Sequence, residues 1–157
     1  MTAERLDQQR YELRPIGRIA RSGDEIRVEI LQPFRPAMQL LDHFTHLIVV
    51  WWADKHDSEK SRAALQCEPP YAPGRVHGVF ATRAEYRPNP IAITTCKMLC
   101  IDEQEGVIQI ANIDALDGTP VIDLKPYYPV CDRVQEARIP EWLSDWPEWI
   151  PEEGLGL

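Results

Sequence analysis

The sequence predicts a mainly β protein, built as a small antiparallel barrel or sandwich. Short apolar segments rich in β-branched residues recur at a spacing of roughly 10–15 residues, with turn residues between them. Fourteen prolines against eight glycines leave little room for long helices. No G-x-G-x-x-G loop follows any predicted strand, which argues against a doubly wound nucleotide-binding fold.

The first half of the chain contains two predicted strands, a short helix and a long loop. Residues 13–20 begin the ordered part, and residues 26–30 (IRVEI) alternate as a strand with one wet face does. Residues 37–44 (AMQLLDHF) are a helical candidate. Residues 47–53 (LIVVWWA) are apolar on both faces, which indicates a buried strand. The polar residues 54–75 form a long loop, and such loops are often functional.

The second half contains the remaining strands. They are residues 76–81 (VHGVFA), 91–99 (IAITTCKML), 107–111 (VIQIA) and 121–124 (VIDL). Glu105-Gly106 and Asp117-Gly118 supply turn chemistry between strands. Six or more short strands with little helix are typical of a barrel or sandwich.

Composition indicates one soluble domain. With 157 residues, 44% of them hydrophobic and 27% charged, the chain is not globally disordered. No apolar run approaches the roughly 20 residues that a membrane helix needs. The polar start MTAERLDQQRYEL lacks the apolar core of a secretory signal. We therefore expect a cytoplasmic protein outside the membrane.

The chain divides into a disordered lead (1–12), a barrel domain (13–131) and an acidic Trp/Pro-rich C-terminal extension (132–157). Residues 1–80 hold 11 basic and 11 acidic side chains, whereas residues 81–157 hold 6 and 14, so the net charge of −8 lies in the second part. This balance disfavours loose electrostatic binding to nucleic acid. Any RNA contact must use a local basic patch.

The C-terminal extension contains three tryptophans, Trp142, Trp146 and Trp149. Their spacing of four and three residues would place them on one face of a helix, but Pro147 interrupts a helix there. Two interpretations stay open: the rings cap one end of the core, or they form a dimer contact or a lid on a site.

The four cysteines, at 67, 96, 100 and 131, form no C-x-x-C pair and have no paired-histidine motif beside them. We expect structural thiols and no metal site.

Residues 78–91 (GVFATRAEYRPNPI) are chemically dense. Two prolines stiffen the backbone around Asn89, whose amide could bind a ligand or its own backbone. Arg83 and Arg87 present planar cations suited to carboxylate or phosphate groups. The alternative is a rigid turn in which these arginines pair with Glu85 and nearby aspartates.

Residues 114–127 (DALDGTPVIDLKPY) form the second dense segment. Asp123 and Lys125 are two apart in a strand, so they point to one face. They form either an exposed ion pair or a polar site near a pocket.

Together, FATR-x-x-x-RPNPI and D-x-x-DGTP-x-x-D-L-KPY resemble the motifs of the TsaA-like family, the TrmO-like transfer-RNA adenine-N6 methyltransferases. The similarity runs from about residue 14 to residue 129 and includes the FTHL sequence at residues 44–47. The chain resembles a short form without the extra C-terminal domain of the longer enzymes.

The resemblance implies a small antiparallel β-barrel with short helices, S-adenosylmethionine as methyl donor, and a homodimer with the cofactor pocket near the subunit boundary. The cofactor-binding residues it implies are Trp52, Asp54, Lys55, Arg83, Ile93, Asp114, Ala115, Leu116 and Asp117. Two departures stand out. Asp54-Lys55 replaces a typical His-Gln, and residues 19–23 (IARSG) replace I-R-S-P-Y, with most of the following loop missing.

The implied reaction is methyl transfer to an adenine N6 amine of transfer RNA, of the position-37 type. A carboxylate or carbonyl would orient the amine and an aromatic ring would stack the base. The candidate catalytic residues are Asn89, Asp114 and Tyr127, and Arg87 and Lys125 are candidate substrate-binding residues. The alternatives are a methyltransferase acting on a small molecule or a protein, and a non-catalytic module that binds S-adenosylmethionine.

Overall fold

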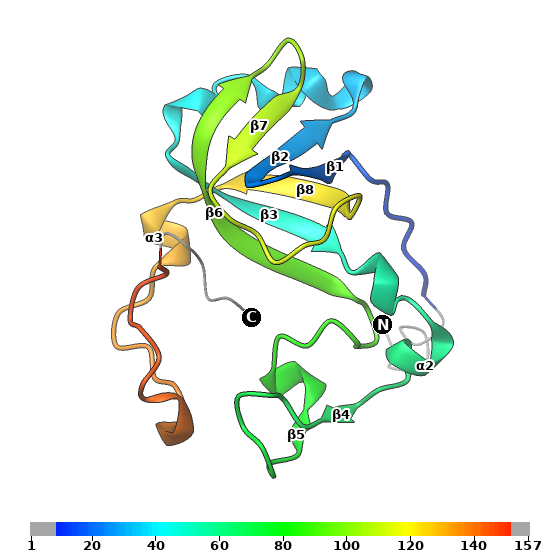
Figure 1. Ribbon diagram of the computed structural model, residues 1–157, viewed down its shortest axis with the longest axis vertical. Coiled ribbons are helices and arrows are strands. Elements are labelled where there is room, and N and C mark those ends of the chain that lie inside the picture. The colour runs from blue at the N-terminus through cyan, green and yellow to red at the C-terminus, as the bar shows by residue number, and fades with distance from the viewer. Residues whose placement is uncertain (1–8, 152–157) are drawn as a thin grey trace.

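Six antiparallel strands close into a barrel in this computed structural model, which describes residues 9–151 (Figure 1). The barrel strands are β1 (Gly17–Ser22), β2 (Glu25–Ile30), β3 (His46–Trp52), β6 (Ile91–Asp102), β7 (Val107–Ile110) and β8 (Pro120–Pro126). Around the barrel they follow the order β1-β2-β7-β6-β3-β8. The predicted mainly β fold with a small antiparallel barrel is confirmed.

The core follows from the alternation of side chains along the strands. In β2, Ile26, Val28 and Ile30 point inward, whereas Arg27 and Glu29 lie between them on the outer face. In β3, alternate residues are buried and the others are half-buried. The expectation that residues 47–53 are buried on both faces is therefore wrong: the outer face of β3 keeps partial contact with solvent.

Strand β6 is long enough to serve two neighbours. Its first part, up to Lys97, pairs with β3, and its second part, from Met98, pairs with β7. An irregularity between Met98 and Cys100 marks the change of partner. The edge of β6 toward β7 is therefore not paired with β7 between Ile91 and Lys97.

Two predicted elements differ from the structure. Residues 37–44 form no α-helix: a 3-10 helix, η1 (Gln32–Met38), and a second one, η2 (Leu41–His43), are separated by Leu40, whose φ of 66° is left-handed. Residues 76–81 contribute only β5 (His77–Gly78) and a 3-10 turn, η4 (Val79–Ala81). β5 pairs with β4 (Gln66–Cys67) in a two-stranded sheet that is separate from the barrel.

The long segment between β3 and β6 forms an excursion from the barrel (Figure 1). It contains η3 (Asp54–His56), α2 (Glu59–Arg62), β4, β5 and η4, so residues 54–75 are a loop only in part. Asp57 accepts a hydrogen bond from Trp52 Nε1 (2.9 Å) and pairs with Arg62, and these contacts fix the start of the excursion. The Arg62 contact, more than any other, lowers the pKa of Asp57.

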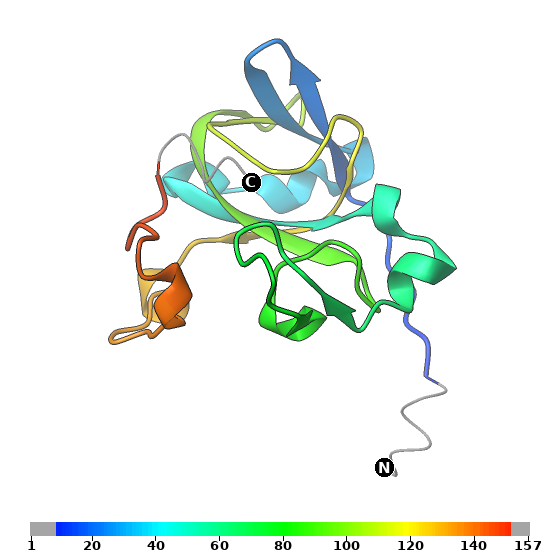
Figure 2. The same cartoon turned by 60° about the horizontal axis from the view of Figure 1, so that its bottom comes forward.

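The two ends of the described part of the chain differ in regular structure. Residues 1–8 of the predicted disordered lead lie outside the described residues, and residues 9–12 are exposed without regular structure. The short helix α3 (Pro129–Asp132) leads into the C-terminal extension, which continues through η5 (Glu141–Leu143) and runs to one side of the barrel (Figure 2). No helix among residues 9–151 is long and apolar enough to cross a bilayer.

Candidate ligand-binding cleft

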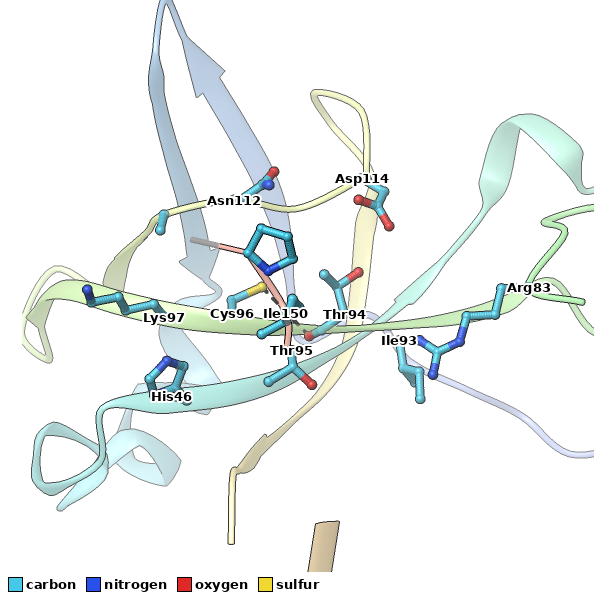
Figure 3. A pocket seen from close by; sticks show the side chains of 12 residues that line it. His46, Arg83, Ile93, Thr94, Thr95, Cys96, Lys97, Asn112, Asp114 and Ile150 are labelled. Carbon is cyan, nitrogen blue, oxygen red and sulfur yellow. Dashed lines mark hydrogen bonds between the residues drawn. The ribbon is translucent and has the colours of Figure 1, made fainter. Parts of the chain in front are cut away.

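A cleft of about 300 Å³ lies along the edge of β6 that is not paired with β7. Ala111 N donates to Lys97 O (3.0 Å) where the loop after β7 leaves the strand. Beyond that bond, residues 111–114 cross opposite β6. The cleft is lined by His46, Arg83, Ile93, Thr94, Thr95, Cys96, Lys97, Ala111, Asn112, Asp114, Ile150 and Pro151 (Figure 3).

Side chains from three distant segments meet at one end of this cleft. Arg83 comes from the excursion, Ile93 from β6, and Asp114 from the loop between β7 and β8. Figure 3 shows Arg83 and Asp114 at the same end, with His46 and Lys97 at the other. This arrangement joins an always-charged cation, an apolar side chain and a carboxylate in a space of the size used by small-molecule sites.

Asp114 is exposed to solvent, yet its surroundings change the pKa of its carboxyl group. Partial burial raises the pKa of its carboxyl group, and the positive charges of Arg83 and Arg21 oppose that rise. The two arginines therefore favour the ionised form of Asp114 at neutral pH.

The loop that carries Asp114 is held by Arg21 of β1. Its guanidinium donates from Nε to Ala115 O (2.9 Å) and from Nη2 to Ile113 O, and its backbone N donates to Asp117 Oδ1 (2.8 Å). Gly118 N donates to Ile19 O (2.8 Å) beside them. Arg21 therefore fixes the backbone on both sides of Asp114.

Cys96 lies at the floor of the cleft. Burial raises the pKa of its thiol to about 12. Since the thiolate is the reactive form, Cys96 has the character of a structural side chain rather than of a nucleophile.

Several predicted cofactor residues lie away from the cleft lining. Trp52 donates to Asp57 at the end of β3, and Asp54 and Lys55 pair with each other (3.1 Å) in η3. Ala115 is buried beneath its loop and Leu116 is exposed. Asp117 neighbours the cleft only through the loop that it shares with Asp114.

The predicted catalytic and substrate residues are also spread out, and only Asp114 lines the cleft. The side chain of Asn89 is exposed in the turn before β6, where Asn89 O accepts from Ile91 N (2.7 Å). Tyr127 is half-buried, with its ring 6.4 Å from that of His46.

The two predicted substrate-binding cations have partners of their own. Arg87 donates to Val79 O (3.2 Å) within its own loop, and Lys125 pairs with Asp123 (2.8 Å) on the outer face of β8. Glu85 pairs with His56 (3.2 Å) rather than with the two arginines of its segment.

Sequence reasoning missed part of the lining. His46 belongs to the FTHL sequence and lies directly opposite Lys97 in the β3–β6 register, so the motif held a signal for it. Asn112 and Thr95 stand in no motif. Arg21 acts on backbone carbonyls more than 90 residues away, and a sequence gives no sign of such a contact.

A second hollow of about 510 Å³ lies between η1 and β8 and is lined mostly by apolar side chains. It contains none of the predicted site residues. The smaller cleft is the candidate site because charged groups from separate segments converge there.

The fold and the site define a class: a small closed barrel with one cleft that is lined by Arg83, from the segment before the RPNPI turn, and by Asp114, from the loop that continues into DGTP. Residues 10–133 match the sequence profile of the tRNA-methyltransferase O N-terminal domain. The chain belongs to this family, and the predicted family membership is confirmed.

Relatives in three organisms illustrate the match. A probable S-adenosyl-L-methionine-binding protein of Archaeoglobus fulgidus is 41% identical over 125 residues, which cover 79% of this chain and 32% of that protein. A protein described in the same words from Pyrococcus abyssi is 36% identical, with coverages of 83% and 66%. A tRNA (adenine(37)-N6)-methyltransferase of Mus musculus is 31% identical, with coverages of 73% and 26%.

The structure is also similar to a crystal structure of TrmO, with a TM-score of 0.64 at 29% identity. The superposition covers 83% of this chain and 64% of the TrmO chain. This chain spans less than two thirds of the length of the first relatives and of that structure.

Proposed function

We propose that this protein transfers a methyl group from S-adenosylmethionine to an exocyclic adenine N6 amine in transfer RNA. The observation that carries the proposal is the meeting of Arg83, Ile93 and Asp114 in one cleft. Two of these residues stand in the family motifs and the third follows one directly. The names of the relatives support both the cofactor and the acceptor.

The residues present fit the proposed cofactor. Its amino-acid end carries a carboxylate and an ammonium, which the guanidinium of Arg83 and the carboxylate of Asp114 complement. Ile93 offers an apolar surface beside them, and it is 49% exposed in the absence of a ligand. Bound S-adenosylmethionine would supply a methyl group already activated by its positively charged sulfur.

The protein then has to position the acceptor. Asp114 is the predicted catalytic residue that lines the cleft, and as a carboxylate it can accept a hydrogen bond from the adenine amine. That bond would aim the nitrogen lone pair and hold the proton that the amine loses on transfer. Holding the donor and the acceptor in line can lower the activation free energy of an enzymatic reaction by roughly 7–11 kcal/mol.

The far end of the cleft suits the RNA. Lys97 and His46 lie there side by side on neighbouring strands, in a chain whose net charge is −8. Lys97 supplies a positive charge there, which favours contact with a polyanion. A base in a single-stranded loop would reach the cleft at little unpairing cost.

We further propose a homodimer that acts in the cytoplasm, where transfer RNA is available. Support for the dimer comes from large apolar side chains left exposed on the excursion and at the start of β6. Phe80 is 80% exposed, Leu65 66% and Ile91 40%. Because Val79 N donates to Leu65 O (3.0 Å), Leu65 lies next to the segment that carries Phe80.

The first test is cofactor binding. Titration calorimetry with S-adenosylmethionine should show binding, and Arg83→Ala should weaken it about 10- to 100-fold, the effect of one charged hydrogen bond. Arg18→Ala is the matched control, because Arg18 pairs with Glu29 (2.8 Å) on the barrel exterior. A pure protein that binds no S-adenosylmethionine would contradict the proposal.

The second test identifies the acceptor. With isotopically labelled methyl donor, total transfer RNA from a strain that lacks the gene should become labelled on N6-methyladenosine. Label found only in small molecules or in proteins would show that the methyl acceptor is one of these and not transfer RNA. Binding without any transfer would identify a non-catalytic module.

A further inference from the structure

We propose that residues 141–151 of the C-terminal extension, called the strap here, cover part of the cleft through Ile150 and Pro151 in the ligand-free protein and move away when the ligand binds. The inference rests on the proposed function, because it assigns a regulation to the same cleft. It starts from a position in the structure: Ile150 and Pro151 are lining residues, together with Arg83 and Asp114.

The strap lies between the two ends of the cleft. Figure 3 shows Ile150 between the Arg83–Asp114 end and the His46–Lys97 end. A methyl donor at one end and an acceptor at the other must come into contact for transfer to occur. The end of the strap therefore borders the space in which donor and acceptor would meet.

Aromatic contacts fasten the strap to the excursion rather than to the barrel core. The ring of Trp142 lies 4.7 Å from the guanidinium carbon of Arg75 and 6.0 Å from the ring of His77. The ring of Trp146 meets that of Tyr71 edge-on at 5.2 Å. We call these contacts the latch.

The latch favours the interpretation of the tryptophans as part of a lid. The core cluster of buried side chains includes none of the three rings, so they do not cap the core. Ile150 is the fourth residue after Trp146, so their Cα atoms are at most about 14 Å apart. The contact of Trp146 with the excursion thus keeps Ile150 near the cleft that it lines.

The hold is weak enough to be reversed. Trp142, Trp146 and Ile150 keep 46%, 36% and 54% of their surface exposed, so each buries only part of its apolar area. Exposed cation–π and edge-on aromatic contacts are individually small. When a ligand binds only the open form, its apparent affinity is reduced in proportion to the fraction of molecules that are open.

The strap also opposes RNA electrostatically. It carries Glu141, Asp145 and Glu148 and no basic residue. While the strap covers the cleft, these three carboxylates stay close to it and repel a polyanion that approaches Lys97. The closed form therefore disfavours both partners of the reaction.

Releasing the latch tests the proposal in the full-length protein. The double variant Trp142→Ala/Trp146→Ala changes no cleft residue, and it should bind S-adenosylmethionine about tenfold more tightly, as expected for a closed form ten times as populated as the open one. Ile139→Ala, an exposed apolar residue that precedes the strap, is the matched control and should leave the affinity unchanged. Weaker or unchanged binding in the double variant would overturn the proposal.

Hydrogen exchange gives a readout that does not need the variant. In the wild-type protein, saturating S-adenosylmethionine should speed amide exchange across residues 141–151, because the strap is displaced. Slower exchange there would mean that the strap closes over the ligand, and it would overturn the proposal.

A third measurement separates this proposal from the proposed function. Without any ligand, the double variant should show faster exchange than the wild type in residues 111–114, since the cover is gone. Faster exchange in a protein that binds no S-adenosylmethionine would support the strap while the proposed function fails. Unchanged exchange would contradict the proposal about the strap, whether or not the protein binds S-adenosylmethionine.

Discussion

At the scale of single residues, Arg21 shows how a site can depend on a side chain outside its lining. It donates to the carbonyls of Ile113 and Ala115, on the two sides of Asp114, and its charge favours the ionised carboxylate. We treat it as a positioning residue: it sets the place and the charge of Asp114 and does not itself line the cleft.

We predict that Arg21→Ala lowers the free energy of unfolding by about 1–3 kcal/mol, since two carbonyls lose a charged donor. It should also raise the pKa of Asp114, because one of the two opposing positive charges is lost. If ligand binding needs the carboxylate, its decline on the acid side should then move to higher pH. Chemical denaturation and calorimetric titration at several pH values measure the two effects.

Arg21→Lys separates charge from geometry. Lysine keeps the positive charge but lacks the planar fork that reaches two carbonyls. In Arg21→Lys, the decline of ligand binding on the acid side should therefore return toward its wild-type pH, while the free energy of unfolding stays reduced. A pH profile that is the same in all three proteins would show that Arg21 acts on stability alone.

At the scale of elements, the β6–β7 hairpin depends on one glycine. Gly106 has a φ of 73°, and its carbonyl accepts from Ile30 N (2.7 Å). A Cβ at this position would lie 2.8 Å from Ile30 O and 2.7 Å from Arg35 Nε. The turn thus needs both a left-handed backbone and the absence of a side chain.

We predict that Gly106→Ala lowers the free energy of unfolding by about 2–4 kcal/mol, from left-handed strain together with steric conflict. Gly23→Ala in the β1–β2 turn is the control. Its φ of 59° is similar, but nothing lies within 4 Å of an added Cβ. Only the strain of about 1 kcal/mol should appear there, and equal losses in thermal or chemical denaturation would refute the steric argument.

At the scale of the whole molecule, the proposed dimer would cover apolar surface that the monomer leaves open. Phe80→Asp places a charge on the most exposed large hydrophobic side chain of the excursion, where it would meet the partner's apolar surface. We predict a monomer at concentrations at which the wild type is a dimer, as measured by light scattering after size exclusion. Val130→Asp, an 89% exposed position in α3, is the control for added charge.

Local patterns were sufficient for much of the fold. Alternation in residues 26–30 and β-branched runs in residues 91–99 and 107–111 predicted strands that the barrel contains. The same reasoning was wrong for residues 76–81, which look like a strand but find a partner only in Gln66–Cys67. A strand needs a partner within reach, and which segment supplies it depends on the path of the whole chain and not on the local pattern.

The sequence by itself determined the family and placed two loops, each with one residue in the cleft, Arg83 and Asp114, because the motifs are stretches of contiguous residues. Tertiary structure alone decided that β6 would leave an edge open beside them, that Arg21 would reach across to the DGTP loop, and that Ile150 would line the cleft. These three features depend on contacts between segments distant in the chain. Such contacts follow from how the barrel closes, which no local pattern records.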